Sequence, residues 1–263
     1  MARFAASISL SLALGLAAVF TDAMAQEQSS APVSGLTDGQ RIQLRAEIRA
    51  YILENPEIIL EAIQILEERR NQAEINADQQ LVARHQDTIF NDGFSYVGGN
   101  PDGDVTVVEF SDYRCGFCKR AHPEIKALLE SDPNIRLIVK EYPILGPDSV
   151  VAGRMALAAL QIDPDKFGEL NDKLMAYPGN LTEAVAYRIA KDVGYELTEL
   201  KQLAAEDEIA RRLGANYALA EQLGLQGTPS FIIGDEIIRG YLPLREMQAA
   251  VAEARTASQA AAN

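Results

Sequence analysis

Two cysteines have the type and the spacing to carry out chemistry. Cys115 and Cys118 are the only cysteines in a chain of 263 residues, and two residues separate them. A disulfide across so short a loop constrains the unfolded chain very little, so a structural cross-link is not expected. Thiol–disulfide exchange needs one thiolate that attacks and a second thiol that resolves the mixed disulfide. The C-x-x-C spacing therefore predicts redox chemistry.

The segments around the cysteines predict how they are positioned. The apolar runs Val105–Phe110 and 135–142 read as buried strands, with a helix between them to about Glu130. Strand, helix and strand over this length predict a βαβ unit with a parallel pair. At the start of the helix, free backbone N–H groups and the helix dipole would stabilise a Cys115 thiolate. Cys118 would lie one turn further in and be more shielded.

The charges near the motif differ from those of the whole chain. Arg114, Lys119 and Arg120 are basic, whereas the formal net charge is −14. An acidic chain is a poor candidate for binding nucleic acid or anionic lipid. The intervening Gly116-Phe117 carries no charge, and the absence of a histidine there favours a milder oxidant.

Metal binding is the alternative use of the thiols. Structural zinc usually takes four ligands, and only two thiols exist. A soft ion such as Cu(I) could use Cys115, Cys118 and His122, which lies four residues after Cys118. His122 is more simply a helix residue, and His85 a solvent-exposed one. No metal or cofactor is expected.

Two further positions bear on the redox chemistry. Glu109 precedes Cys115 by six residues on the predicted strand. If its carboxyl group points under the helix, it could take the proton of Cys118; a surface-facing Glu109 is the alternative. Thr228-Pro229 precedes a predicted hairpin formed by Ser230–Ile233 and 237–239. A cis bond there would expose the Thr228 backbone to an extended peptide, although only about 5–6% of X-Pro bonds are cis.

The N-terminus predicts export. Arg3 is followed by the apolar run 4–20 and by the A-x-A site at 23–25. This is the pattern of a cleaved signal peptide over residues 1–25, rather than of an uncleaved anchor. A periplasmic location is expected.

The segment from 26 to 92 predicts a helical extension. Apolar residues recur at helical spacing before Asn55-Pro56 and again after it. With no Gly or Pro between Pro56 and Asp92, the second helix is expected to be about 50 Å long. Its first part is apolar enough to need a partner surface, and its polar second part is expected to be a spacer that packs on no core.

The sequence resembles the DsbA-like thioredoxin-fold oxidoreductases over about residues 96–255. The motifs that carry this resemblance are Glu109-Phe110, Cys115–Cys118, Pro123 and Gly227–Phe231. The resemblance implies an α/β thioredoxin fold with an inserted helical domain, Cys115 as nucleophile, Cys118 as resolving thiol, Glu109 as buried acid and a cis Thr228-Pro229 bond. Residues 51–58 are similar to the ScsC-like subgroup, in which such a segment can drive trimerisation and members can act as isomerases.

The resulting domain plan has four parts after the signal peptide. It comprises an oligomerisation or stalk region (26–92), a catalytic domain (93–256), its helical insertion (about 148–224) and a frayed tail (257–263). A last helix is expected over about 244–255.

Three functions remain open: an oligomeric disulfide isomerase, a monomeric DsbA-type dithiol oxidase, and a copper-binding thiol protein. The expected partners are exported proteins with cysteines, a membrane redox partner and two further copies in a homotrimer, with no nucleic acid. Deletion of residues 26–92 is expected to leave a folded monomer.

Overall fold

The computed structural model describes residues 35–262, so the expected signal peptide lies outside the described residues. The chain divides into two compact units, one up to Ile63 and one from Gln64 onward. None of the helices in residues 35–262 combines the length and the apolarity needed to span a membrane.

Two helices form the N-terminal extension. Helix α1 (Asp38–Glu54) begins with a capping box, in which Thr37 and Gln40 satisfy each other's backbone N–H groups. Helix α2 (Glu57–Arg84) has 28 residues, and His85 separates it from the short helix α3 (Gln86–Phe90). The expectation of one uninterrupted helix of about 50 Å is wrong, because 28 residues at 1.5 Å span about 42 Å.

A five-stranded sheet in the order β1-β3-β2-β4-β5 lies at the centre of the second unit. The central pair β2 (Val105–Ser111) and β3 (Ile135–Glu141) is parallel, as expected from the βαβ pattern. The strands β1 (Tyr96–Gly99), β4 (Ser230–Ile233) and β5 (Glu236–Arg239) add to it antiparallel. This is the expected thioredoxin fold, with the unpredicted β1 at one edge.

One face of the sheet is covered by α4 (Gly116–Ser131) and α10 (Leu244–Ala262). Val105 and Val107 of β2 pack there against α4 residues such as Ile125 and against Met247 of α10. Since side chains alternate along a strand, Glu109 points to this same face, under α4. Helix α10 is longer than expected and continues through most of the predicted tail.

The opposite face buries residues from the end of the N-terminal extension. Val82 (4% exposed) and Ile89 (0%) pack in one cluster with Val108 and Phe110 of β2. Asp78 of α2 also makes a two-pronged ion pair with Arg239 of β5, at 2.7 and 2.8 Å. The expectation that the polar part of this segment packs on no core is therefore wrong from Asp78 onward.

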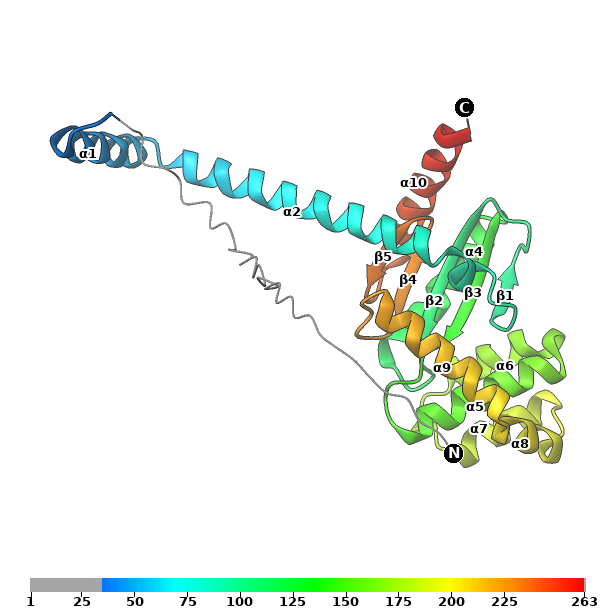
Figure 1. Cartoon of the computed structure of the whole chain (residues 1–263). Helices are drawn as coiled ribbons and strands as arrows, with labels where there is room; N and C mark the ends of the chain where they lie inside the picture. Colours follow the sequence, from blue (N-terminus) through cyan, green and yellow to red (C-terminus); the bar gives the residue numbers. More distant parts are fainter. Residues whose placement is uncertain (1–34, 263) are drawn as a thin grey trace, which may run out of the picture. The chain divides into compact units, whose positions relative to one another are not determined.

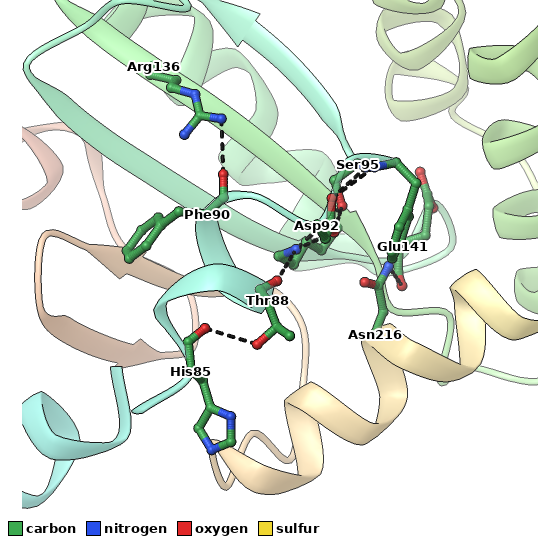
Figure 2. A network of polar contacts seen from close by, with 10 residues as sticks. His85, Thr88, Phe90, Asp92, Ser95, Arg136, Glu141 and Asn216 are labelled. Carbon is green, nitrogen blue, oxygen red and sulfur yellow. Dashed lines mark hydrogen bonds and ion pairs between the residues drawn. The ribbon is translucent and has the colours of Figure 1, made fainter. Parts of the chain in front are cut away.

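A polar junction fastens the loop after α3 to strand β3. Lys140 has a fully buried side chain that contacts Asp92 at 2.5 Å and donates to the Thr88 carbonyl at 2.9 Å. Arg136, on the same strand, donates to the Phe90 carbonyl at 3.0 Å (Figure 2). These bonds satisfy a buried ammonium group that would otherwise be costly.

Five helices are inserted between β3 and β4 and gather at one end of the sheet (Figure 1). Their bounds are α5 (Pro147–Ile162), α6 (Pro164–Ala176), α7 (Glu183–Val193), α8 (Leu197–Ala205) and α9 (Asp207–Gln222). They share a hydrophobic cluster that extends to Tyr113, Cys115 and Cys118. The insertion therefore forms one wall of the cysteine site.

Candidate active site

The two cysteines lie where β2 passes into α4. Cys115 is the N-cap residue of α4, and its carbonyl accepts the Lys119 N–H at 3.0 Å. Cys118 lies within the first turn and is 0% exposed, whereas Cys115 is 6% exposed. The pair is therefore arranged as an outer thiol with access and an inner thiol without it.

The loop before β4 contacts the outer thiol directly. The Thr228-Pro229 bond is cis, so the base-rate expectation of a trans bond is wrong at this position, and the one implied by the resemblance holds. The Cys115 thiol donates a hydrogen bond of 3.1 Å to the Thr228 carbonyl oxygen. Segments 113 residues apart thus meet at one sulfur atom.

The surroundings polarise the two thiols in opposite directions. Hydrogen bonds that Cys115 Sγ accepts, first from the Cys118 thiol and then from the Thr228 side chain and the N–H groups of Cys118 and Phe117, lower the pKa of Cys115 to about 5, although burial opposes this. Burial, with the hydrogen bond to Cys115 and the charge of Glu109, raises the pKa of Cys118 well above its usual range. The lowered pKa favours the thiolate form of Cys115 at neutral pH, so we expect the outer cysteine to be the nucleophile of the pair.

Glu109 is buried beneath α4 and is 3% exposed, so the surface-facing alternative is wrong. Its Oε1 accepts a hydrogen bond of 2.9 Å from Ser111 Oγ. Burial raises its pKa to about 7, despite the opposing hydrogen bond from Ser111. A carboxyl group with this pKa can both release and take up a proton near neutrality.

Asp112 is a buried residue that sequence reasoning missed. One carboxylate oxygen accepts the Arg114 N–H at 2.8 Å, and the other accepts the N–H groups of Ile144 and Leu145 at 2.9 and 3.0 Å. It thereby joins the turn before Cys115 to the loop after β3. Asp side chains commonly accept the backbone N–H two residues further on, which forms an Asx turn. An Asp at position 112 was therefore a sequence signal for the bond to Arg114.

Basic and aromatic side chains surround the outer thiol. Arg114 donates to the Leu145 carbonyl and the Asn180 side chain, and Lys119 donates to the Tyr177 carbonyl at 2.6 Å. Phe117 is 54% exposed beside Tyr241, and the Arg120 guanidinium lies over both rings. A protein surface can dock on this combination of apolar and basic groups.

The copper alternative gains no support from the geometry. In residues 35–262 no three His, Cys, Asp or Glu side chains gather in a way that could hold a metal ion. His122 instead contacts Asp172 through Nε2 at 2.8 Å.

Two family models match the chain. The model described as DSBA-like thioredoxin domain matches residues 106–252, and the one described as copper resistance protein ScsC N-terminal domain matches residues 40–73.

Solved structures are similar to the chain both over the thioredoxin domain and over a longer part of the chain. A thioredoxin-like oxidoreductase from Silicibacter pomeroyi is 42% identical, with a TM-score of 0.62, over 65% of this chain and 97% of that one. A linker-deletion variant of Proteus mirabilis ScsC is 28% identical, with a TM-score of 0.64, over 86% of this chain and 100% of that one.

Curated relatives include longer proteins. The Na(+)/H(+) antiporter NhaA 1 of Salinispora arenicola is 30% identical over 161 residues, which are 60% of this chain but 24% of the antiporter.

Proposed function

The chain belongs to the family of DSBA-like thioredoxin domains, and on this premise we propose that it is an exported thiol–disulfide oxidoreductase that assembles into a trimer and acts mainly as a disulfide isomerase. The observation that carries the redox part is the pair of thiols with opposite polarisation: Cys115 is slightly exposed and has a lowered pKa, whereas Cys118 is fully buried and has a raised pKa.

The roles follow from this polarisation. The Cys115 thiolate attacks a wrong disulfide of a client, forms a mixed disulfide and releases one client cysteine as a thiolate. That client thiolate can attack elsewhere, which is isomerisation. Alternatively, Cys118 gives up its proton to Glu109, attacks Cys115 Sγ and frees the client with two reduced cysteines.

Assembly is supported by the apolar surface of the first two helices. Helix α1 buries none of its residues and α2 buries only Val82. Large apolar side chains at half or more exposure line both helices: Ile42, Ile48, Tyr51, Leu53, Ile59, Leu60, Ile65 and Leu66. Each fully exposed side chain of this kind forgoes about 1.5–3 kcal/mol of burial free energy. We propose that copies of these helices from several chains form a bundle, in which their apolar surfaces cover one another.

The number of copies rests on the ScsC resemblance. The matching ScsC N-terminal model covers residues 40–73, which include most of the exposed apolar positions. Three catalytic units around a shared space would raise the effective concentration of client thiols near each Cys115. They would also hinder access by a membrane partner of the kind that reoxidises the cysteine pair of a monomeric oxidase.

The native mass of the mature chain, residues 26–263, tests the assembly by light scattering at micromolar concentration. We expect the mass of a trimer and reactivation of scrambled ribonuclease. The variant Ile48→Lys/Ile59→Lys should be monomeric and lose isomerase activity while it keeps dithiol oxidation. Gln43→Lys, an added charge at an exposed polar position of α1, is the matched control. A monomeric wild-type protein would favour the DsbA-type oxidase instead.

A further inference from the structure

A cavity of about 180 Å³ lies beside Glu109, between α4, α6 and the sheet. Glu109 lines it from β2, His122 and Lys126 from α4, and Asn171 and Asp172 from α6. Because a water molecule takes about 30 Å³ in the liquid, the cavity has room for several. It connects the buried acid to residues at the surface.

Asn171 indicates that the cavity is hydrated. It is 6% exposed, and no protein group within the described residues bonds its Oδ1 atom. A buried carbonyl oxygen without a protein partner is normally satisfied by ordered water. Glu109 also has acceptor positions beyond the one that Ser111 uses. Polar side chains thus lie among the apolar walls of the cavity, which include Ile125, Leu137 and Val139.

His122 and Asp172 form the outer end of this path. The His122 side chain is 14% exposed and contacts Asp172 Oδ1 at 2.8 Å, and the Asp172 side chain is 42% exposed. Lys126 Nζ contacts the other oxygen, Oδ2, at 2.5 Å. Burial lowers the pKa of His122 in spite of Asp172, so the ring is neutral and able to accept a proton at pH 7.

The titratable groups that face His122 come from four elements. They are Lys126 on its own helix, Asp172 on α6, Glu109 on β2 and Tyr96 on β1. Burial and Asp172 raise the pKa of Tyr96, so it stays protonated near neutrality. Of these groups, Glu109 has its pKa raised to about 7 by burial, and the lowered pKa of His122 leaves its ring neutral at pH 7.

We propose that Glu109, the hydrated cavity and the His122–Asp172 pair form the route by which the Cys118 proton reaches solvent. In the resolving step, Glu109 takes the proton from Cys118, and the Cys118 thiolate bonds to Cys115 Sγ as the client sulfur leaves. The protonated Glu109 then passes its proton through water to the His122–Asp172 pair, in which the neutral ring donates its Nε2–H to Asp172 Oδ1 and can accept the incoming proton at Nδ1, and from there to solvent. When the motif disulfide oxidises a client, the same proton travels inward to the departing Cys118 thiolate. His122 is a positioning and relay residue that acts through Glu109. The proposal rests on the proposed exchange activity but not on isomerisation or assembly.

The test separates the two chemical steps with glutathione disulfide as the probe. The reduced mature protein is mixed with glutathione disulfide, quenched with acid and analysed by mass spectrometry. Formation of the glutathione adduct reports attack by Cys115, and its decay reports resolution by Cys118. In His122→Gln we expect adduct formation within about twofold of wild type and adduct decay slowed about tenfold at pH 7. This is less than the roughly 100-fold or more typical of a group that transfers the proton directly, because His122 acts through Glu109.

Three controls make this result specific. His85→Gln changes the only other histidine, which caps α3, and should leave both rates unchanged. Added imidazole should restore decay in His122→Ala and leave wild type unaffected. Glu109→Gln/His122→Gln should be no slower than Glu109→Gln alone, because the two residues act in series.

Either of two results would overturn the relay: adduct decay in His122→Gln equal to wild type from pH 6 to 8, or slow decay in His122→Ala that imidazole does not restore. Both leave the proposed function standing as long as the adduct forms at Cys115. Failure of the adduct to form at all would instead refute the proposed function.

Discussion

The Cys115 thiol donates a hydrogen bond of 3.1 Å to the carbonyl oxygen of Thr228, a residue 113 positions further along the chain. The backbone edge that precedes β4 therefore lies directly beside the reactive sulfur. An extended client peptide that pairs with the Thr228 backbone would bring its own disulfide to Cys115 Sγ. One contact thus joins Cys115 to the backbone edge that we expect to present the substrate.

Selective alkylation should identify Cys115 as the reactive thiol. Because its pKa is lowered to about 5, it is largely thiolate at pH 6, where an ordinary cysteine is not. Iodoacetamide at pH 6, followed by peptide mapping of the reduced protein, should label Cys115. Cys115→Ser should leave Cys118 unlabelled under the same conditions. Faster labelling of Cys118 in wild type would reverse the two roles.

Replacement of Glu109 should separate its chemical role from any structural one. Glu109→Gln should slow resolution by Cys118 without lowering the melting temperature of the reduced protein, because it removes a buried charge.

The stability of the wild-type protein should depend on pH through Glu109. The raised pKa of about 7, against an ordinary value of 4.5, means that the folded state binds more protons than the unfolded state between these two pH values. The wild-type free energy of unfolding therefore loses a contribution as pH rises through this window, by up to about 3 kcal/mol.

Urea unfolding of the reduced proteins at pH 4.5 and pH 8 measures this effect. The stability of Glu109→Gln relative to wild type should be greater at pH 8 than at pH 4.5. The titration of Cys115 has the opposite sign, but it is present in both proteins and largely cancels in the difference. An equal difference at both pH values would show that Glu109 keeps an ordinary pKa.

The local patterns around the motif predicted the centre of the fold well. The runs 105–110 and 135–142 match β2 and β3 closely, because strands buried on both faces are continuous apolar segments. Strand β1 was not predicted, since its four residues, Tyr-Val-Gly-Gly, contain two glycines, which propensity assigns to turns. Only tertiary pairing with β3 makes this segment a strand.

The misjudged spacer has a different physical cause. Asp78 and Asp92 lie in the segment that was expected to pack on no core, but each has a cationic partner far along the chain, Arg239 and Lys140 respectively. Long-range pairs of this kind leave no periodicity in the sequence. The same holds for the bonds of Asp112 to Ile144 and Leu145 and for the cavity beside Glu109, which depends on how α4 and α6 meet the sheet.

Substitution of Asp112 should loosen the turn that precedes Cys115. Asp112→Asn keeps one carbonyl acceptor but turns an amide N–H₂ group toward backbone N–H donors. We expect a loss of about 1–3 kcal/mol in the free energy of unfolding, from the donors left unsatisfied, together with slower reaction at Cys115. Urea denaturation and the rate of adduct formation measure the two effects. Asp102→Asn, in an exposed loop, is the control and should change neither.

The buried pair Lys140–Asp92 should be worth far more than a surface pair. Asp92→Asn leaves the fully buried Lys140 ammonium without its counter-charge, which typically costs about 3–5 kcal/mol. Lys140→Met combined with Asp92→Asn should recover part of this loss, because no uncompensated charge remains. Asp104→Asn breaks an exposed pair with Arg255 and should cost less than about 1 kcal/mol. Similar losses in Asp92→Asn and Asp104→Asn would contradict the assignment.

The end point of an N-terminal deletion should decide whether the remaining chain is stable. A deletion of residues 26–92 removes Val82, Ile89 and Asp92, so it opens the core on one face of the sheet and leaves Lys140 unpaired. A deletion of residues 26–63 ends where the second compact unit begins and keeps all of these contacts. We therefore expect the shorter deletion to give a folded monomer that retains dithiol oxidation but loses isomerase activity. The longer one should melt at a markedly lower temperature, and calorimetry of both reduced proteins would measure this. Equal melting temperatures would show that the segment from Gln64 to Asp92 adds nothing to the stability of the catalytic unit. The contacts of Val82 and Ile89 would then make no measurable contribution to the free energy of unfolding.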